Sequence, residues 1–262
     1  MPERTDLRAA LEELAATPVL LVALDFDGVL SPLVERAQDA RPLPRSSAAL
    51  KALAALPSTT TALISGRALG SLRQVASPEP ETLLIGSHGA ETWTGPDAAP
   101  LTLDPRQAEL LDAAADIVES VVAAHPGTWL ESKPAGVVLH TRSAADDIAA
   151  DAVAAARDGL AGLDGLKVTD GKRVLEVSVV HADKGQGLGL LRELSGATAV
   201  LFAGDDVTDE HAFAVLQPQD VGIKIGEGRT EARYRLGSPE DLAGTLEDLL
   251  TLRRECASSN HS

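Results

Sequence analysis

Two aspartates stand directly after the apolar run Val19 to Leu24. Asp25 and Asp27 are two residues apart, and Gly28 beside them allows the backbone to turn sharply. In such a pair, one carboxylate can attack a phosphorus atom while the other passes a proton to the leaving oxygen. The same residues also suit an ordinary strand that ends in a polar turn. The rest of the sequence must decide between these two interpretations.

Ser65 and Lys184 are two further candidates for binding a phosphoryl group. Ser65 ends the apolar, β-branched run Thr59 to Ile64, where its hydroxyl and the nearby N–H groups can hold phosphate oxygens. Lys184 follows Asp183 at the start of a predicted helix and can neutralise charge on a nucleophile and a phosphoryl group. Taken singly, each has an ordinary alternative, a strand-to-helix turn for Ser65 and a solvated side chain for Lys184.

An acidic cluster follows the apolar run Ala199 to Ala203. Asp205 and Asp206 are adjacent, and Asp209 and Glu210 come shortly after them. Neighbouring like charges repel, and a bound cation offsets that cost most readily. Oxygen-only ligands favour Mg²⁺, which keeps several waters and needs only one or two carboxylates plus a substrate phosphate. Alternatively, Asp206 or Thr208 caps a helix that begins near Asp209, and both roles can coexist.

These side chains are expected at the carboxyl ends of parallel strands. The run Val19 to Leu24 is apolar almost throughout, which is typical of a parallel strand buried on both faces. Open α/β sheets bind ligands at the carboxyl ends of their strands. Strand-like and helix-like segments alternate along this part of the chain. The helix after the first strand is expected to be capped by Ser46 or Ser47. The predicted strands are 19–24, 59–64, 82–85, 199–203 and 221–225.

The alternation changes between residues 105 and 181. We predict two hairpins there, 128–133 with 137–142 and 166–169 with 173–178, separated by a helix that Ser143 caps. This pattern indicates an inserted α+β domain. The predicted domains are therefore 1–104 (first part of the core), 105–181 (cap) and 182–262 (second part of the core).

Composition excludes several classes of protein. The 262 residues carry a formal net charge of −16, which argues against a protein that binds nucleic acid or an anionic membrane. No apolar run approaches the length that crosses a bilayer. The single cysteine, Cys256, can form no internal disulfide, so we expect a reducing, cytoplasmic location.

Taken together, the motifs resemble those of a known enzyme family. The order Asp25-x-Asp27-Gly28, Ser65, Lys184 and Gly204-Asp205-Asp206 is similar to the four motifs of the haloacid dehalogenase superfamily. Within it, the segment 204–213 resembles the signature of the trehalose-6-phosphate phosphatases. Further segments similar to that family are Ser65-Gly66-Arg67, 86–91, Glu131-x-Lys133, His140-x-Arg142 and 171–177.

The resemblance implies a fold and a reaction. The fold would be α/β, a Rossmann-like core with a parallel sheet, interrupted by a smaller α/β cap domain with an antiparallel sheet. The reaction would be Mg²⁺-dependent hydrolysis of trehalose 6-phosphate to trehalose and phosphate, the last step of trehalose biosynthesis. An aspartyl-phosphate would form on Asp25, with Asp27 as general acid and then general base.

The same resemblance implies roles for further residues. Ser65 and Lys184 would hold the phosphoryl group. The metal would be bound by Asp25, the Asp27 carbonyl and Asp205. Asp206 would be either a further ligand or a group that contacts the ligands. The substrate-binding residues would be Arg67, His88, Glu131, Lys133, Arg142 and Glu176.

The predicted cap strands support sugar binding independently. Residues two apart on a strand share a face, so Trp129, Glu131 and Lys133 project together. Glu176 lies on a neighbouring strand, and such a face offers the acceptors and donors that a polyol needs. The alternative is an ordinary charged solvent face of an antiparallel sheet.

Alternative functions stay open at this stage. The substrate could be another sugar phosphate, such as sucrose 6-phosphate or a glycosyl phosphoglycerate, or the chain could be a non-catalytic sugar-phosphate sensor. The expected partner is a small-molecule sugar phosphate, with no nucleic acid and no membrane, and we expect a monomer.

Overall fold

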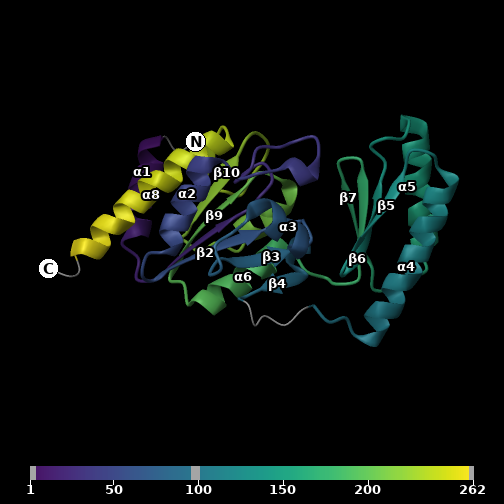
Figure 1. Cartoon of the computed structure of the whole chain (residues 1–262), viewed down its shortest axis with the longest axis horizontal. Helices are drawn as coiled ribbons and strands as arrows, with labels where there is room; N and C mark the ends of the chain where they lie inside the picture. Colours follow the sequence, from purple (N-terminus) through teal and green to yellow (C-terminus); the bar gives the residue numbers. More distant parts are fainter. Residues whose placement is uncertain (1–3, 96–100, 260–262) are drawn as a thin grey trace. The chain divides into compact units, whose positions relative to one another are not determined.

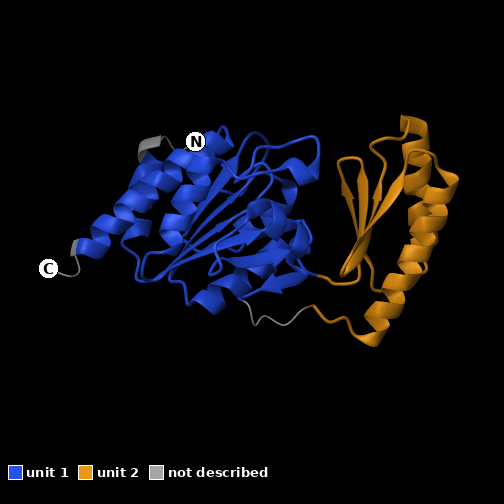
Figure 2. Ribbon diagram, in the orientation of Figure 1, with its two compact units in different colours: residues 1–100, 182–262 blue, residues 101–181 orange. Residues whose placement is uncertain are grey.

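The computed structural model describes residues 4–95 and 101–259. The chain divides into two units, 1–100 with 182–262 and 101–181 (Figure 2). We call the first the core unit and the second the cap unit, and each is described by itself.

One sheet of seven strands forms the centre of the core unit (Figure 1). Its order is β11-β10-β9-β1-β2-β3-β4, and every pairing is parallel except that of β3 with β4. Leu24 at the end of β1 pairs with Leu63 of β2 and Ala203 of β9, so the three strands end at one edge. The strands are β1 (Leu20–Leu24), β2 (Thr59–Ile64), β3 (Leu83–Gly86), β4 (Glu91–Trp93), β9 (Ala199–Gly204), β10 (Val221–Ile225) and β11 (Tyr234–Leu236).

Helices cover both faces of this sheet, because β1 is apolar on both sides. Leu20, Val22 and Leu24 lie in one hydrophobic cluster, whereas Leu21 and Ala23 lie in another. The first cluster includes residues of α1 (Arg4–Ala15), α2 (Pro44–Ala54), α3 (Leu69–Ala76) and α8 (Pro239–Ser259). The second includes residues of α6 (Lys184–Ser195) and α7 (Glu210–Phe213). The described part of the core unit also contains the short 3₁₀ turns η1 (Ala37–Asp39), η2 (Ser87–Gly89) and η3 (Val207–Asp209).

The cap unit is an antiparallel sheet with two helices packed on one face. Its strand order is β5-β6-β8-β7. Leu130, Leu139 and Leu175 pair across three strands and face a hydrophobic cluster shared with the helices. On each strand, the residues next to these leucines face the opposite side of the sheet. The elements are α4 (Pro105–Ala124), β5 (Trp129–Lys133), β6 (Gly136–His140), α5 (Asp146–Leu160), β7 (Lys167–Gly171) and β8 (Val174–Ser178).

The predicted fold class is confirmed, but the two predicted serine caps are wrong. Helix α2 begins at Pro44, whose ring fixes φ and whose missing N–H needs no cap, so Ser46 lies inside the helix. Helix α5 begins at Asp146 after Ala145, and acidic side chains in its first turn favour the helix dipole. The short strands β4 and β11 were not predicted. No helix within the described residues has both the length and the apolar character needed to cross a membrane.

Candidate active site

Asp25 is buried at the end of β1. The Phe26 N–H donates to one carboxylate oxygen at 2.6 Å, and Lys184 Nζ donates to the other at 2.8 Å. Burial raises the pKa of Asp25 well above its usual value, although the charge of Lys184 opposes that rise. Both oxygens of the predicted nucleophile therefore have a fixed donor.

Lys184 is the first residue of α6, where Asp183 caps the helix by accepting from the Gln186 N–H at 2.8 Å. Its Nζ donates to Asp25 and, at 2.7 Å, to Asp209. Burial alone would lower the pKa of Lys184, but the two carboxylates raise it above its ordinary value. The ammonium group therefore stays charged beside the predicted nucleophile, as a phosphoryl-binding cation must.

Asp209 connects Lys184 to the loop that carries Asp205 and Asp206. One oxygen accepts from Lys184, and the other accepts from the N–H groups of Asp205 at 3.0 Å and Asp206 at 2.9 Å. A Cβ on Gly204 would lie 2.4 Å from the Asp209 side chain, so a glycine is needed where the two approach. The sequence predicted Asp209 as part of an acidic cluster near a cation, either as a ligand or in contact with the ligands, but not its hydrogen bonds with Lys184 and the loop.

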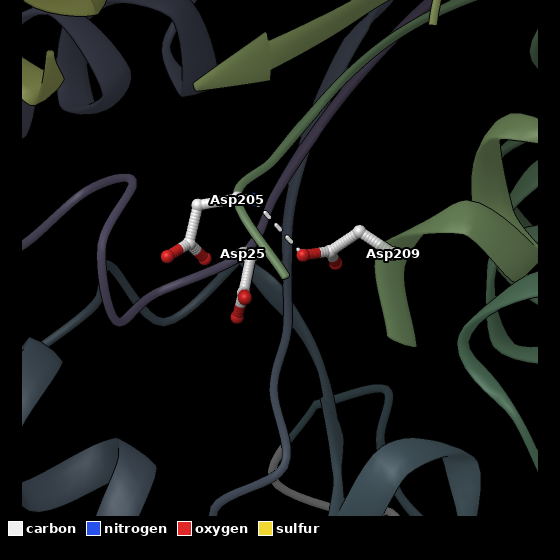
Figure 3. A group of neighbouring side chains, drawn as sticks. All are labelled: Asp25, Asp205 and Asp209. Carbon is white, nitrogen blue, oxygen red and sulfur yellow. Dashed lines mark hydrogen bonds between the residues drawn. The ribbon is translucent and has the colours of Figure 1, made fainter. Parts of the chain in front are cut away.

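Asp205 and Asp206 have different surroundings. Carboxylate oxygens of Asp25, Asp205 and Asp209 all lie within 4.8 Å of one another (Figure 3). Burial and the nearby Asp209 raise the pKa of Asp205 to about 6. Asp206 is exposed, and its carboxylate caps η3 by accepting from the Val207 N–H at 2.7 Å. Asp206 therefore caps the 3₁₀ turn η3 instead of the helix predicted to begin near Asp209, and its carboxylate lies outside the cluster of three.

The residues present fit a hard divalent cation. The cluster offers only oxygen atoms, the donors that Mg²⁺ prefers. Gly28 has φ +78°, and a Cβ there would lie 2.1 Å from the Asp205 carboxylate, so glycine leaves room for that group. The two oxygens of Asp209 accept from three donors, whereas those of Asp25 accept from two, so Asp25 and Asp205 keep more acceptor capacity for a metal than Asp209 does.

Asp27 forms a two-pronged ion pair with Arg67. Nε and Nη2 of Arg67 each donate to a different carboxylate oxygen at 2.6 Å. The Arg67 guanidinium also lies 5.4 Å from the centre of the Phe26 ring. Arg67, which was predicted to bind substrate, therefore orients the predicted general acid in this structure.

Ser65, which follows β2, and His88, in the η2 turn after β3, lie on loops that contact each other. The buried Ser65 hydroxyl accepts from the Arg67 N–H at 3.2 Å, and the His88 N–H donates to the Ser65 carbonyl at 3.0 Å. A Cβ on Gly66 would lie 2.4 Å from the His88 ring, so that ring packs directly over the Ser65–Arg67 turn. Glu91 supports the loop by accepting from the Ser87 hydroxyl at 2.6 Å.

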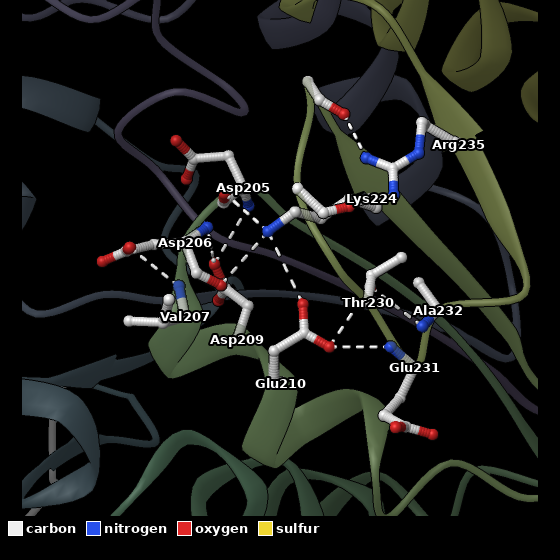
Figure 4. A network of polar contacts seen from close by, with 12 residues as sticks. Asp205, Asp206, Val207, Asp209, Glu210, Lys224, Thr230, Glu231, Ala232 and Arg235 are labelled. Atoms are coloured by element: carbon white, nitrogen blue, oxygen red, sulfur yellow. Dashed lines mark hydrogen bonds and ion pairs between the residues drawn. The ribbon is translucent and has the colours of Figure 1, made fainter.

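Lys224 supports the acidic loop from β10 (Figure 4). Its buried Nζ donates to the Asp205 carbonyl at 2.7 Å and lies 3.5 Å from a carboxylate oxygen of Glu210. The other Glu210 oxygen accepts from the Glu231 N–H at 2.8 Å. Only the three-dimensional structure reveals this contact, because an isolated lysine in a strand carries no signal.

The cap unit brings four polar side chains to one face of its sheet. His140 Nε2 lies 2.8 Å from Glu131, and Lys133 pairs with Glu176. The hydrogen bond with His140 lowers the pKa of Glu131. Arg142 is exposed and follows the end of β6, outside this strand face.

Comparisons with known proteins identify the family of this chain. The family described as trehalose-phosphatase matches residues 23–240. A trehalose-phosphate phosphatase of Mycobacterium avium is 36% identical over 245 residues, covering 87% of this chain and 61% of that protein. An uncharacterized glycosyl hydrolase of Mycobacterium tuberculosis is 34% identical over 95% of this chain, which corresponds to 20% of its own length. The chain thus spans less than two thirds of the length of these relatives.

Solved structures agree in fold. A trehalose-6-phosphate phosphatase of Aspergillus fumigatus has a TM-score of 0.69 at 27% identity, covering 93% of this chain and 97% of the other. The C-terminal domain of the C. albicans trehalose-6-phosphate phosphatase has a TM-score of 0.77 at 22% identity, covering 94% and 98%. The chain therefore belongs to the trehalose-phosphatase family, a family of phosphatase enzymes with the haloacid dehalogenase fold.

Proposed function

We propose that this chain hydrolyses trehalose 6-phosphate to trehalose and phosphate through an aspartyl-phosphate on Asp25. The observation that carries the proposal is the buried array in which Lys184 bridges Asp25 and Asp209. It fixes a carboxylate next to a cation at the ligand-binding edge of the sheet. Membership of the trehalose-phosphatase family supports the choice of substrate.

In the first step the Asp25 carboxylate attacks phosphorus and the P–O bond to the sugar breaks. Asp27 gives its proton to the leaving sugar oxygen, and Lys184 and Ser65 hold the phosphoryl oxygens. In the second step Asp27 takes a proton from water, which attacks the phosphorus of the aspartyl-phosphate. Phosphate then leaves, and both aspartates regain their starting states.

The pairing of Asp27 with Arg67 adds a requirement. The guanidinium donates to both carboxylate oxygens of Asp27, so both oxygens are engaged as acceptors. The acid role needs a proton on Asp27, so Arg67 must release at least one oxygen before the first step. A substrate phosphate gives the guanidinium another anion to bind, which reconciles its predicted substrate contact with the pair observed.

Mg²⁺ is the metal that we propose for this site. Asp25, Asp205 and the Asp27 carbonyl would hold it, with Asp206 behind them and Asp209 and Lys224 fixing the loop. When bound, the ion would neutralise negative charge on the phosphoryl group. Both Asp25 and Asp205 have raised pKa values from burial and neighbouring negative charge, a penalty that a cation relieves.

We propose that the cap unit binds the sugar. Glu131, Lys133 and Glu176 lie on the sheet face that does not pack on the cap helices. Their carboxylate and ammonium groups can exchange their mutual contacts for sugar hydroxyls. We also propose a cytoplasmic location and a monomeric state for this chain, as expected from the sequence.

A phosphate-release assay with a panel of substrates tests the proposal. We expect Mg²⁺-dependent turnover of trehalose 6-phosphate well above that of sucrose 6-phosphate, a glycosyl phosphoglycerate and glucose 6-phosphate. Preference for another member of the panel would replace the substrate and keep the chemistry. If the wild-type protein turns over none of them but binds trehalose 6-phosphate, the sensor alternative replaces the proposal. The Asp25→Asn variant is the control for contaminating phosphatases.

A further inference from the structure

An exposed tryptophan lies on the polar face of the cap sheet. The Trp129 indole stacks on the His140 ring, with ring centroids 3.6 Å apart and planes inclined by 1°. Trp129 nevertheless keeps 46% of its surface exposed, more than most large apolar side chains of a folded protein. One face of the indole is thus covered and held flat, and the other side is accessible within the cap unit.

The residues around Trp129 are polar and are fixed by the sheet. Trp129 pairs with His140 across β5 and β6, and His140 Nε2 lies 2.8 Å from Glu131 on the same face. Farther along that face Lys133 pairs with Glu176 from β8. The helices pack on the opposite face, so the indole takes no part in the hydrophobic cluster of the unit.

This combination has a specific chemical match. A pyranose ring has an apolar face of C–H groups and an equator of hydroxyls. The C–H groups favour a flat aromatic surface, and the hydroxyls need carboxylate acceptors and an ammonium donor. A purely structural tryptophan would be expected to turn its ring into the hydrophobic cluster, and a purely electrostatic anion site would need no aromatic plane.

We propose that Trp129 is a stacking platform for one pyranose ring of the sugar substrate. His140 is its positioning residue, because it backs the indole and is itself oriented by Glu131. The inference rests on the proposed function for the identity of the sugar, but the contact itself concerns pyranosides as a class. Trp129 would then contribute to preference for a disaccharide phosphate over simpler phosphate esters.

Fluorescence tests the contact directly, because the chain has only two tryptophans. In the Trp93→Phe variant all tryptophan emission comes from Trp129, and Trp93 belongs to β4 of the core unit. We expect trehalose to change this emission saturably, and the Asp25→Asn background allows the same titration with trehalose 6-phosphate. If Trp93→Phe does not fold, the difference in emission between wild type and Trp129→Phe gives the same signal.

Enzyme kinetics test how much Trp129 contributes to the hydrolysis of trehalose 6-phosphate. Trp129→Ala should lower kcat/KM for trehalose 6-phosphate by about tenfold, while Trp129→Phe, which keeps an aromatic face, should recover most of that loss. Both variants should hydrolyse p-nitrophenyl phosphate within about twofold of wild type, as should the matched control Trp93→Phe. Equal losses of kcat/KM on both substrates, or no loss on either, would contradict the proposal that Trp129 stacks on the sugar.

The outcomes separate this inference from the proposed function. If wild type hydrolyses no trehalose 6-phosphate, the proposed function fails, and titration with trehalose, sucrose, maltose and methyl glucoside still decides the contact. A saturable change with any of these pyranosides supports the platform. Unchanged Trp129 emission with all four sugars, in a folded protein, removes it even if trehalose 6-phosphate is the substrate.

Discussion

Lys184 and Asp209 of the core unit have side-chain exposures of 2% and 0%, whereas Glu131 of the cap unit keeps 41% of its side chain exposed. The core charges hold one another through contacts from β1, α6 and the loop after β9. The cap charges lie on one sheet and are less deeply buried, with Lys133 and Glu176 keeping 13% and 22% of their side chains exposed. Buried charges in fixed contact suit chemistry that is the same for every phosphate ester. Accessible charges suit recognition, because a sugar hydroxyl can replace their present partners.

The largest expected effect is that of Asp25→Asn. An amide cannot act as the nucleophile, so turnover should fall on the order of 10⁵-fold or more for trehalose 6-phosphate and for p-nitrophenyl phosphate alike. Phosphate release measures the loss, and rapid acid quenching should trap a phosphoenzyme in wild type only. Normal turnover in a folded Asp25→Asn protein would remove Asp25 from the proposed reaction.

A stability comparison contrasts a buried ion pair with an exposed one. Asp209→Ala leaves the Lys184 ammonium buried with one carboxylate fewer, so the free energy of unfolding should fall by about 3–5 kcal/mol. Asp170→Ala breaks the exposed pair of Asp170 with Arg157 in the cap unit and should cost less than about 1 kcal/mol. Urea denaturation of both variants measures the difference. Equal losses in the free energy of unfolding would mean that the buried ion pair of the core unit is no more important for stability than the exposed pair of the cap unit.

The third prediction separates recognition from chemistry. Glu131→Gln and Glu176→Gln should each lower kcat/KM for trehalose 6-phosphate by about tenfold to a hundredfold, since buried sugar hydroxyls would lose charged partners. Hydrolysis of p-nitrophenyl phosphate should be nearly unchanged, because that ester has no sugar. Parallel losses on the two substrates would show that these glutamates serve the fold, and the assignment of sugar binding to the cap unit would be withdrawn.

The smallest expected effect is that of Lys224→Met. Lys224 donates to the Asp205 carbonyl without lying in the cluster of three carboxylates, so the Mg²⁺ concentration for half-maximal activity should rise about tenfold. Direct titration of Mg²⁺ by calorimetry should show the same weakening, with KM for the sugar phosphate unchanged at saturating metal. Lys51→Met, which breaks a surface pair with Glu79, is the matched control and should leave metal binding as in wild type. Unchanged Mg²⁺ affinity in Lys224→Met would limit Lys224 to a role in folding.

Local patterns predicted the main elements of both units. The apolar run before Asp25 predicted a buried parallel strand, and alternation in residues 129–133 placed Trp129 and Glu131 on one face. Helix starts were less predictable, because Pro44 and Asp146 open helices without a serine cap. The strands β4 and β11 escaped notice because three residues show too little periodicity to detect.

The sequence by itself determined which chemical groups stand at the ends of the strands, since a parallel strand buried on both faces must be apolar and the polar side chains can only follow it. Only the tertiary structure decided how those groups pair. Arg67 meets Asp27 across 40 residues and Lys184 meets Asp209 across 25, contacts that depend on how the strands and helices pack. The stacking of Trp129 on His140 follows from the register of β5 and β6. Hydrophobic periodicity is a local property of the chain, whereas register and helix packing arise when distant segments bury their apolar surfaces together.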